Sequence, residues 1–113
     1  MKKIVLAIAT IVFLSSCSIN TKYSWYNYND ASYKYYKQQT EETKKDLMEA
    51  YEKMLNNQKG TRNIVPPGLC AEYGYILCSE GKKQEGIKYL KMEIELYPES
   101  EIFISRIIKQ MEE

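Results

Sequence analysis

Histidine is absent from the sequence, and with it the residue that enzymes most often use as a general acid or base. The 113 residues also hold no Cys-X-X-Cys pair and no glycine-rich phosphate loop, and the carboxylates are scattered over predicted helix surfaces. Acid-base hydrolases, zinc enzymes and nucleotide-binding enzymes depend on such groups. We therefore expect no enzyme activity, no metal, no cofactor and no small-molecule substrate.

A strong charge of either sign is also missing, since 16 Lys and Arg residues face 15 Asp and Glu residues. Lys2 and Lys3 belong to a predicted leader, and without them the count becomes 14 to 15. No basic field then remains to attract nucleic acid or anionic lipid. We expect no nucleic-acid partner.

No apolar run reaches the ~20 residues that a membrane-spanning helix needs, but the N-terminus has the organisation of a signal peptide. Lys2 and Lys3 precede eleven mostly apolar residues at 4–14, and a Leu-Ser-Ser-Cys sequence ends this segment at Cys17. This is the pattern of a lipoprotein signal peptide with its lipobox. We predict that residues 1–16 form the leader. A cleaved secretory signal with an incidental Cys17 is the alternative.

The leader resembles those of bacterial lipoproteins, which implies that Cys17 carries acyl chains, palmitate among them, and begins the mature protein. Ser18 is not the Asp that tends to hold enteric-type lipoproteins at the inner membrane. We therefore expect anchoring at the periplasmic face of the outer membrane, through two or three acyl chains that hold stably. Residues 17–22 form a short tether, which keeps the predicted domain at 23–112 close to the bilayer.

An aromatic-rich segment follows the tether. Residues 23–36 hold six tyrosines and the only tryptophan of the sequence, Trp25. We expect an extended or turning piece broken near residues 27–30, followed by a short helical turn. Aromatic side chains bury large areas yet keep a polar tip. Three interpretations remain open: packing on the rest of the same chain, a partner interface, or a place among lipid headgroups.

Three later segments have helical patterns. Thr40 offers an N-cap to a helix with apolar residues at 47, 48, 51, 54 and 55. Residues 67–97 predict two antiparallel helices joined near Gly81 and stopped by Pro98. Ser100 can cap a last helix with apolar residues at 103, 104, 107, 108 and 111.

Residues 67–100 resemble a tetratricopeptide repeat (TPR), whose 34-residue period sets a Trp-like residue, Leu, Gly and Tyr on its first helix, then Ala, Phe and Pro. The matching positions are Cys70, Tyr73, Gly74, Leu77, Gly86, Leu90 and Pro98. The two glycines predict a close crossing of the helices. Cys70 and Glu93 depart from the pattern, which has a bulky aromatic and a small residue there. An ordinary helical hairpin in a small bundle is the alternative.

The predicted fold is all-α: a TPR-like helical hairpin flanked by one N-terminal helix and one C-terminal capping helix, with the aromatic-rich segment in front. Cys70 and Cys78 lie on one predicted helix, roughly 12 Å apart along its axis. This exceeds the ~7 Å limit for a disulfide. We expect both to be small buried hydrophobic residues.

Three motifs together resemble a family of short bacterial TPR-like lipoproteins of unknown function. They are the Tyr-Ser-Trp at 23–25, the Pro-Pro-Gly at 66–68 with Ala-Glu-Tyr-Gly-Tyr at 71–75, and the Pro-Glu-Ser at 98–100. Tyr26 departs from the family pattern, which usually has Gly after the Trp. The resemblance implies an outer-membrane lipoprotein, often encoded beside a lipoprotein resembling the curli secretion channel and a third small lipoprotein. It implies no catalytic residues.

We therefore expect a lipid-anchored periplasmic adaptor that supports an outer-membrane protein complex. By analogy with TPR domains, the first helix of the hairpin would present Ala71, Glu72, Tyr75, Cys78 and Ser79 on a concave face. The predicted partner-binding residues are Trp25, Tyr28, Glu72, Tyr75 and Ser79, and the lipidation site is Cys17. The alternative is a structural or self-associating envelope lipoprotein without a dedicated partner.

Overall fold

The computed structural model describes residues 21–113, and within this range all regular structure is helical. The predicted signal peptide, Cys17 and most of the tether lie outside the described residues. The helices are α2 (Tyr28–Lys37), α3 (Glu41–Asn56), α4 (Leu69–Ser79), α5 (Lys83–Leu96), the 3-10 turn η1 (Pro98–Ser100) and α6 (Glu101–Glu112). Among the described helices, none has the length and apolar character required to cross a membrane.

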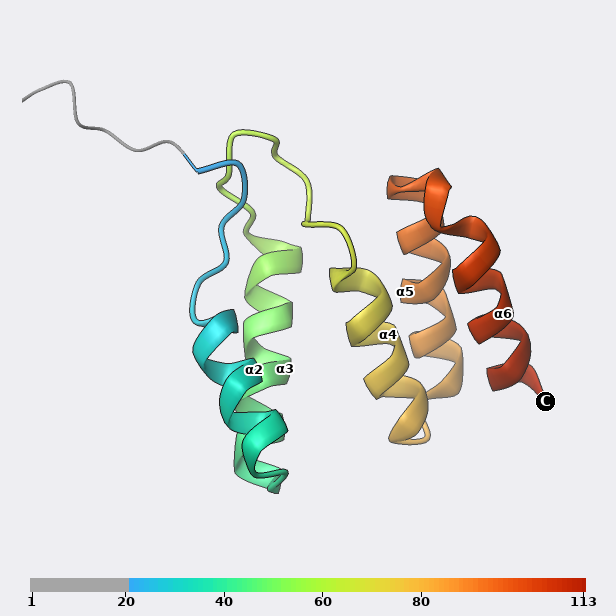
Figure 1. The fold of residues 1–113 in the computed structure, drawn as a ribbon, viewed down its shortest axis with the longest axis horizontal. Helices are drawn as coiled ribbons and strands as arrows, with labels where there is room; N and C mark the ends of the chain where they lie inside the picture. Colours follow the sequence, from blue (N-terminus) through green and yellow to red (C-terminus); the bar gives the residue numbers. More distant parts are fainter. Residues whose placement is uncertain (1–20) are drawn as a thin grey trace, which may run out of the picture.

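The helices form two stacked antiparallel hairpins and a cap (Figure 1). Helices α2 and α3 make the first hairpin, α4 and α5 make the second, and α6 runs back along α5. One hydrophobic core joins the two hairpins, with Leu47, Tyr51 and Met54 from α3 meeting Tyr73 and Leu77 from α4. The all-α prediction is confirmed, and the arrangement is compatible with the TPR-like description.

The second hairpin is held by direct contact between backbones. A Cβ atom on Gly74 would lie 2.6 Å from the carbonyl oxygen of Gly86, and one on Gly86 would lie 2.5 Å from the carbonyl oxygen of Gly74. No side chain fits at such a crossing, so the predicted close approach of the two helices is confirmed. Gly81, in the left-handed region at φ 88°, makes the turn between them.

Glu93, a departure from the TPR pattern, has a structural role. Its side chain is only 3% exposed, and its Oε1 atom accepts a hydrogen bond of 3.2 Å from the N–H of Ala71 in the first turn of α4. The N-cap of α4 is Gly68, which has no side chain to accept such a bond. A carboxylate at a helix N-terminus satisfies an open N–H group and suits the helix dipole. Helix α5 therefore caps α4.

The cysteines of the second hairpin are free. Cys70 is fully buried, whereas Cys78 is only partly buried, so the prediction of two buried cysteines holds for the first alone. Burial, with the nearby Glu93 carboxylate as a second cause, raises the pKa of the Cys70 thiol to about 12. A thiol in such surroundings packs as a small hydrophobic group.

The N-terminus of α3 is capped as its sequence predicts. The Oγ1 atom of Thr40 accepts from the N–H of Thr43 at 3.1 Å, and the Oγ1 atom of Thr43 accepts from the N–H of Thr40 at 3.0 Å. This reciprocal pair is a capping box. It fixes the start of a helix whose inner face is completely buried at Leu47, Ala50, Tyr51 and Met54.

The first hairpin corrects the prediction for the aromatic segment. Instead of an extended piece and a short helical turn, residues 28–37 form a ten-residue helix, α2. Tyr28, Ala31 and Tyr35 recur at helical spacing and pack into or against the core. Before α2, Tyr26 adopts the left-handed region at φ 48°, a conformation that glycine reaches freely and other residues rarely adopt. Packing on α3 therefore outweighs the preference of tyrosine for strands.

Candidate functional site

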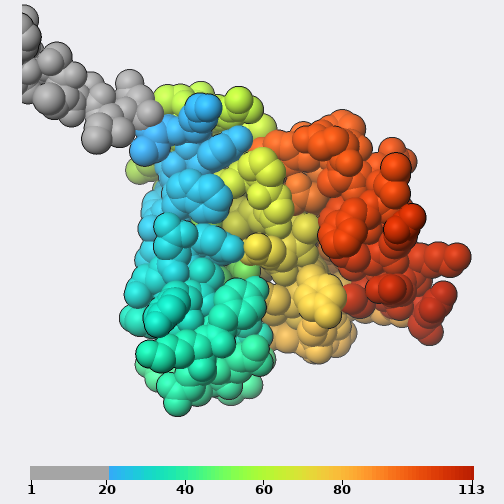
Figure 2. Space-filling model, in the orientation of Figure 1, coloured from blue at the N-terminus to red at the C-terminus, as the bar shows by residue number. Residues whose placement is uncertain are grey.

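A groove runs over the face that α2, α4 and α6 share (Figure 2). In this view the yellow surface of α4 lies between the blue-green surface of α2 and the red surface of α6. The hollow has a volume of about 220 Å³. Its lining residues are Tyr36, Ala71, Glu72, Tyr75, Ile76, Phe103 and Ile107. This arrangement is compatible with the TPR-like description, in which the first helices of neighbouring hairpins line one face.

The groove is mainly aromatic and aliphatic, and Glu72 is its only charged lining residue. Tyr75 is 51% exposed and Phe103 is 67% exposed, so both rings face solvent over much of their surface. Large exposed apolar side chains gathered at one place indicate an interaction surface when a few polar groups accompany them.

Two tyrosines hold the Glu72 carboxylate in place. Its Oε2 atom accepts hydrogen bonds from the hydroxyl groups of Tyr28 at 2.7 Å and Tyr51 at 3.0 Å. Burial first, and the Glu72 carboxylate in addition, raise the pKa of both hydroxyl groups well above the ordinary range of tyrosine. Both therefore stay protonated as donors. Among residues 21–113, no lysine or arginine forms an ion pair with Glu72.

The same tyrosines belong to a continuous series of ring contacts that crosses the molecule. Ring centroids lie 5.6 Å apart for Trp25 and Tyr28, 5.7 Å for Tyr28 and Tyr51, and 5.6 Å for Tyr51 and Tyr73. Tyr73 then contacts Tyr89 on α5 at 4.7 Å. Such pairs contribute about 0.5–1.5 kcal/mol each beyond their buried area. The N-terminal aromatic segment thus packs on its own chain, mostly on α3.

The predicted site residues fall in different places. Glu72 and Tyr75 line the groove, whereas Tyr28 does not line it but donates a hydrogen bond to Glu72. Trp25, 40% exposed, precedes α2 and does not line the groove. Ser79 is exposed near the end of α4, where its Oγ atom donates to the carbonyl oxygen of Tyr75 at 3.0 Å. Cys17 lies outside the described residues.

The sequence analysis did not include Tyr36, Phe103 and Ile107 among the binding residues. The position of Tyr36 in the groove could be predicted only if residues 28–37 were known to form a helix. Phe103 and Ile107 are four residues apart on one face of α6, but their spacing does not show that this face turns toward α4. A terminal helix is expected to turn a polar face outward, and an exposed phenylalanine on it points instead to a binding surface.

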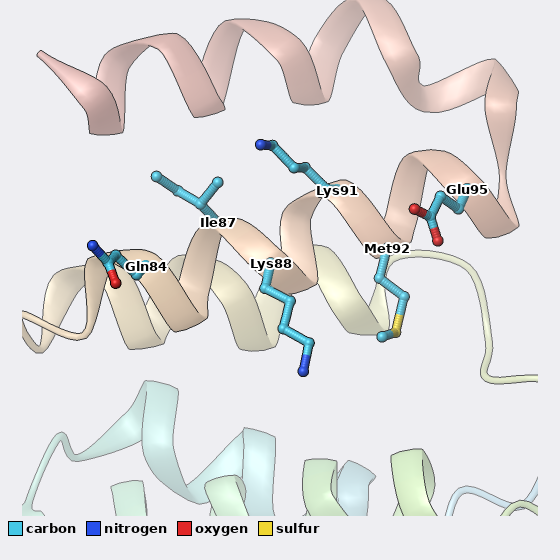
Figure 3. A pocket seen from close by; sticks show the side chains of 6 residues that line it. All are labelled: Gln84, Ile87, Lys88, Lys91, Met92 and Glu95. Atoms are coloured by element: carbon cyan, nitrogen blue, oxygen red, sulfur yellow. The ribbon is translucent and has the colours of Figure 1, made fainter.

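A second hollow, of about 380 Å³, lies along α5 between Gln84 and Glu95 (Figure 3). Its side chains diverge: Lys91 points toward α6, while Lys88 and Met92 point the opposite way. Lysine and glutamine side chains without a common focus make a solvated surface. The smaller groove on the other face has the convergent aromatic side chains and the fixed carboxylate, so it is the better candidate site.

The lining of the groove offers contacts for binding. Aromatic faces, two isoleucines and one carboxylate offer apolar contact and one strong acceptor. In the described part of the chain, no group of three or more Cys, Asp and Glu residues is arranged to hold a metal ion.

Comparison with curated proteins and with solved structures gives no match. The model of one protein family, described as "Domain of unknown function (DUF4810)", matches residues 22–107. This match spans the aromatic segment, both hairpins and more than half of α6. The chain therefore belongs to this family of unknown function.

Proposed function

We propose that this protein is a lipid-anchored adaptor of the bacterial envelope. Acyl chains on Cys17 would hold it at the periplasmic face of the outer membrane, and its groove would bind another envelope protein and support the assembly of an outer-membrane complex. Support for the anchor comes from the leader: two lysines, an apolar run of eleven residues and the Leu-Ser-Ser-Cys sequence. The resemblance described above makes a lipoprotein like the curli secretion channel the first partner to test.

The observation that carries the binding role is the exposure of aromatic side chains around one carboxylate in the groove. Tyr36 from α2, Tyr75 from α4 and Phe103 from α6 converge there while remaining exposed. Aromatic residues are enriched at protein interfaces because they offer large contact areas at a small loss of conformational entropy. None of these three rings belongs to the buried core.

The groove suits a short segment of a protein with one apolar side chain and a neighbouring lysine or arginine. Its volume of about 220 Å³ is below the roughly 300–1,000 Å³ of ordinary small-molecule pockets, so a side chain fits better than a metabolite. Glu72 is already oriented by two hydroxyl donors and lacks a basic partner among the described residues. A cationic group from the partner would complete a charge-assisted hydrogen bond there.

Affinity purification of the acylated protein in mild detergent, after brief crosslinking in cells, tests this proposal. We expect a stoichiometric envelope protein to co-purify with the wild-type chain. Tyr75→Ala and Glu72→Gln should reduce its recovery at least tenfold at unchanged abundance of the bait. Gln84→Ala, on the opposite face, is the matched control and should retain the partner. Recovery of intact bait without a partner would contradict the adaptor role.

A structural or self-associating lipoprotein is the second candidate, and one observation favours it. Ile102 is 75% exposed beside Phe103 at the end of the helix array, where a capping helix normally presents polar groups. Two copies of the chain could associate through this apolar end. In that case Ile102→Lys would convert an oligomer to a monomer in sedimentation experiments, whereas the adaptor role predicts no change in oligomeric state.

A further inference from the structure

One end of the molecule concentrates positive charge that the overall count conceals. Residues 21–26 and 57–62, which we call the strap end, are joined by backbone hydrogen bonds near the top of Figure 1, from where residues 21–26 run down to α2. They contain Lys22, Lys59 and Arg62 and no acidic residue. All three cationic side chains are exposed. The nearly neutral total therefore reflects an uneven distribution of charge.

Specific hydrogen bonds build this end. The N–H groups of Thr61 and Arg62 donate to the carbonyl oxygens of Thr21 and Lys22, at 3.0 and 3.2 Å. The N–H of Lys59 donates to the Ser24 Oγ atom at 3.1 Å. A Cβ atom on Gly60 would collide with the backbone of Lys22, so the two segments touch directly. The three cations are thus fixed on adjoining backbone segments.

The cations remain available for an external anion. Within the described range, the ion pairs formed by lysine or arginine involve only Lys34 and Lys44. Trp25 and Tyr26 lie beside the cations, 40% and 43% exposed, and the Tyr26 hydroxyl donates to the carbonyl oxygen of Asn57. Amphipathic aromatic rings next to cations are typical of surfaces that sit at the level of lipid headgroups.

The course of the chain brings this end to the membrane. Only three residues separate Cys17 from Thr21, so even a fully extended link spans roughly 14 Å. We propose that the strap end rests on the phosphate headgroups of the bilayer, with Lys22, Lys59 and Arg62 contacting phosphate and Trp25 lying among the headgroups. This inference rests on the anchoring at Cys17 in the proposed function.

The contact would also orient the groove. Glu99 and Glu101 lie in η1 and at the start of α6, near the same end but on the side away from the strap. Phosphate groups repel these carboxylates, so the molecule would tilt until the strap end, and not Glu99 and Glu101, contacts the bilayer. The helices run away from this end (Figure 1). The face shared by α2, α4 and α6 would therefore point along the membrane surface and not toward it. A partner anchored in the same membrane could then reach the groove.

Trp25 provides the test, because it is the only tryptophan of the chain. The acylated protein is reconstituted into vesicles of phosphatidylethanolamine and phosphatidylglycerol. A fraction of the lipid molecules carries a nitroxide on the headgroup as the quencher. We expect the nitroxide to quench more than half of the Trp25 fluorescence. Lys22→Gln/Lys59→Gln/Arg62→Gln should lose at least half of this quenching, as should the wild type in 0.5 M salt.

Two control proteins locate the effect. Lys37→Gln/Lys82→Gln/Lys83→Gln removes three exposed cations from the opposite end and should quench like the wild type. Trp25→Phe/Gln39→Trp moves the tryptophan to that end and should be quenched little. Flotation of the protein with the vesicles shows separately whether the acyl chains attach it to the membrane. Chains that float but show equal quenching at positions 25 and 39 would overturn the headgroup contact alone. Chains that do not float would overturn the anchor and this inference together.

Discussion

The two hairpins reach the same antiparallel arrangement by different kinds of contact. In the second hairpin, Gly74 and Gly86 let the backbones of α4 and α5 touch. In the first, large rings fill the space, with Tyr28 against Tyr51 at 5.7 Å and the small Ala31 buried near them. The second hairpin is therefore specified by its own residues, whereas the first depends on rings that also contact α4 and the N-terminal segment.

The largest expected effect breaks the first hairpin. Tyr51→Ala removes a fully buried ring that contacts Tyr28 and Tyr73 and a donor to Glu72. We expect the free energy of unfolding to fall by about 3–5 kcal/mol. Urea denaturation followed by circular dichroism measures it. Tyr33→Ala, an exposed tyrosine on α2, is the control and should change stability by less than about 0.5 kcal/mol. Equal effects of the two changes would contradict the account.

A glycine substitution breaks the second hairpin. Gly74→Ala places a methyl group 2.6 Å from the Gly86 carbonyl oxygen, and we expect a loss of about 2 kcal/mol despite the better helix propensity of alanine. Gly81→Ala meets no atom within 4 Å and should cost about 1 kcal/mol, through its positive φ alone. The same urea experiment compares them. A Gly74→Ala protein as stable as the wild type would show that the helices do not touch there.

Alkaline pH tests the buried core between the two hairpins through its effect on the free energy of unfolding. Burial raises the pKa of the Cys70 thiol and of the Tyr73 hydroxyl to about 12 each. The folded state therefore keeps these protons at pH values where the unfolded state loses them. Their contribution to stability is complete below about pH 9 and is lost progressively as the pH rises toward 12. Urea titrations at pH 8, 9 and 10 should show falling stability.

Cys70→Ala identifies the thiol's share of this pH dependence. The variant should be less stable at pH 8, because a buried sulfur atom is lost, but its stability should fall less steeply between pH 9 and 10. A slope identical to that of the wild type would mean that Cys70 does not contribute.

The smallest effect concerns the turn before α2. Tyr26→Gly relieves a left-handed backbone but removes the hydrogen bond to Asn57, so we expect a net change within about 1 kcal/mol. Tyr26→Ala loses the same hydrogen bond without relieving the backbone. It should be less stable than Tyr26→Gly by roughly 1 kcal/mol. Equal stabilities of the two variants would argue against a left-handed residue at this position.

The contrast between the hairpins also explains what the sequence predicts. Helices α3, α4, α5 and α6 have periodic apolar residues with caps, glycines or prolines at their ends. Helix α2 has inner residues at helical spacing, Tyr28, Ala31 and Tyr35, but it has no side-chain cap and no glycine or proline at its ends, and its tyrosines favour a strand. In the groove, Glu72 and Tyr75 follow from the TPR resemblance. Tyr36 and Phe103 join them only through tertiary packing, which no local pattern records.

The central claim is that the groove between α2, α4 and α6 binds an envelope protein. The most direct measurement places a photo-crosslinking amino acid at position 103 in the groove or at position 84 on the opposite face, in cells that carry the acylated protein. We predict one discrete heteromeric product from position 103 and none from position 84. Identical products from both positions, or products containing only this chain from position 103, would contradict the claim.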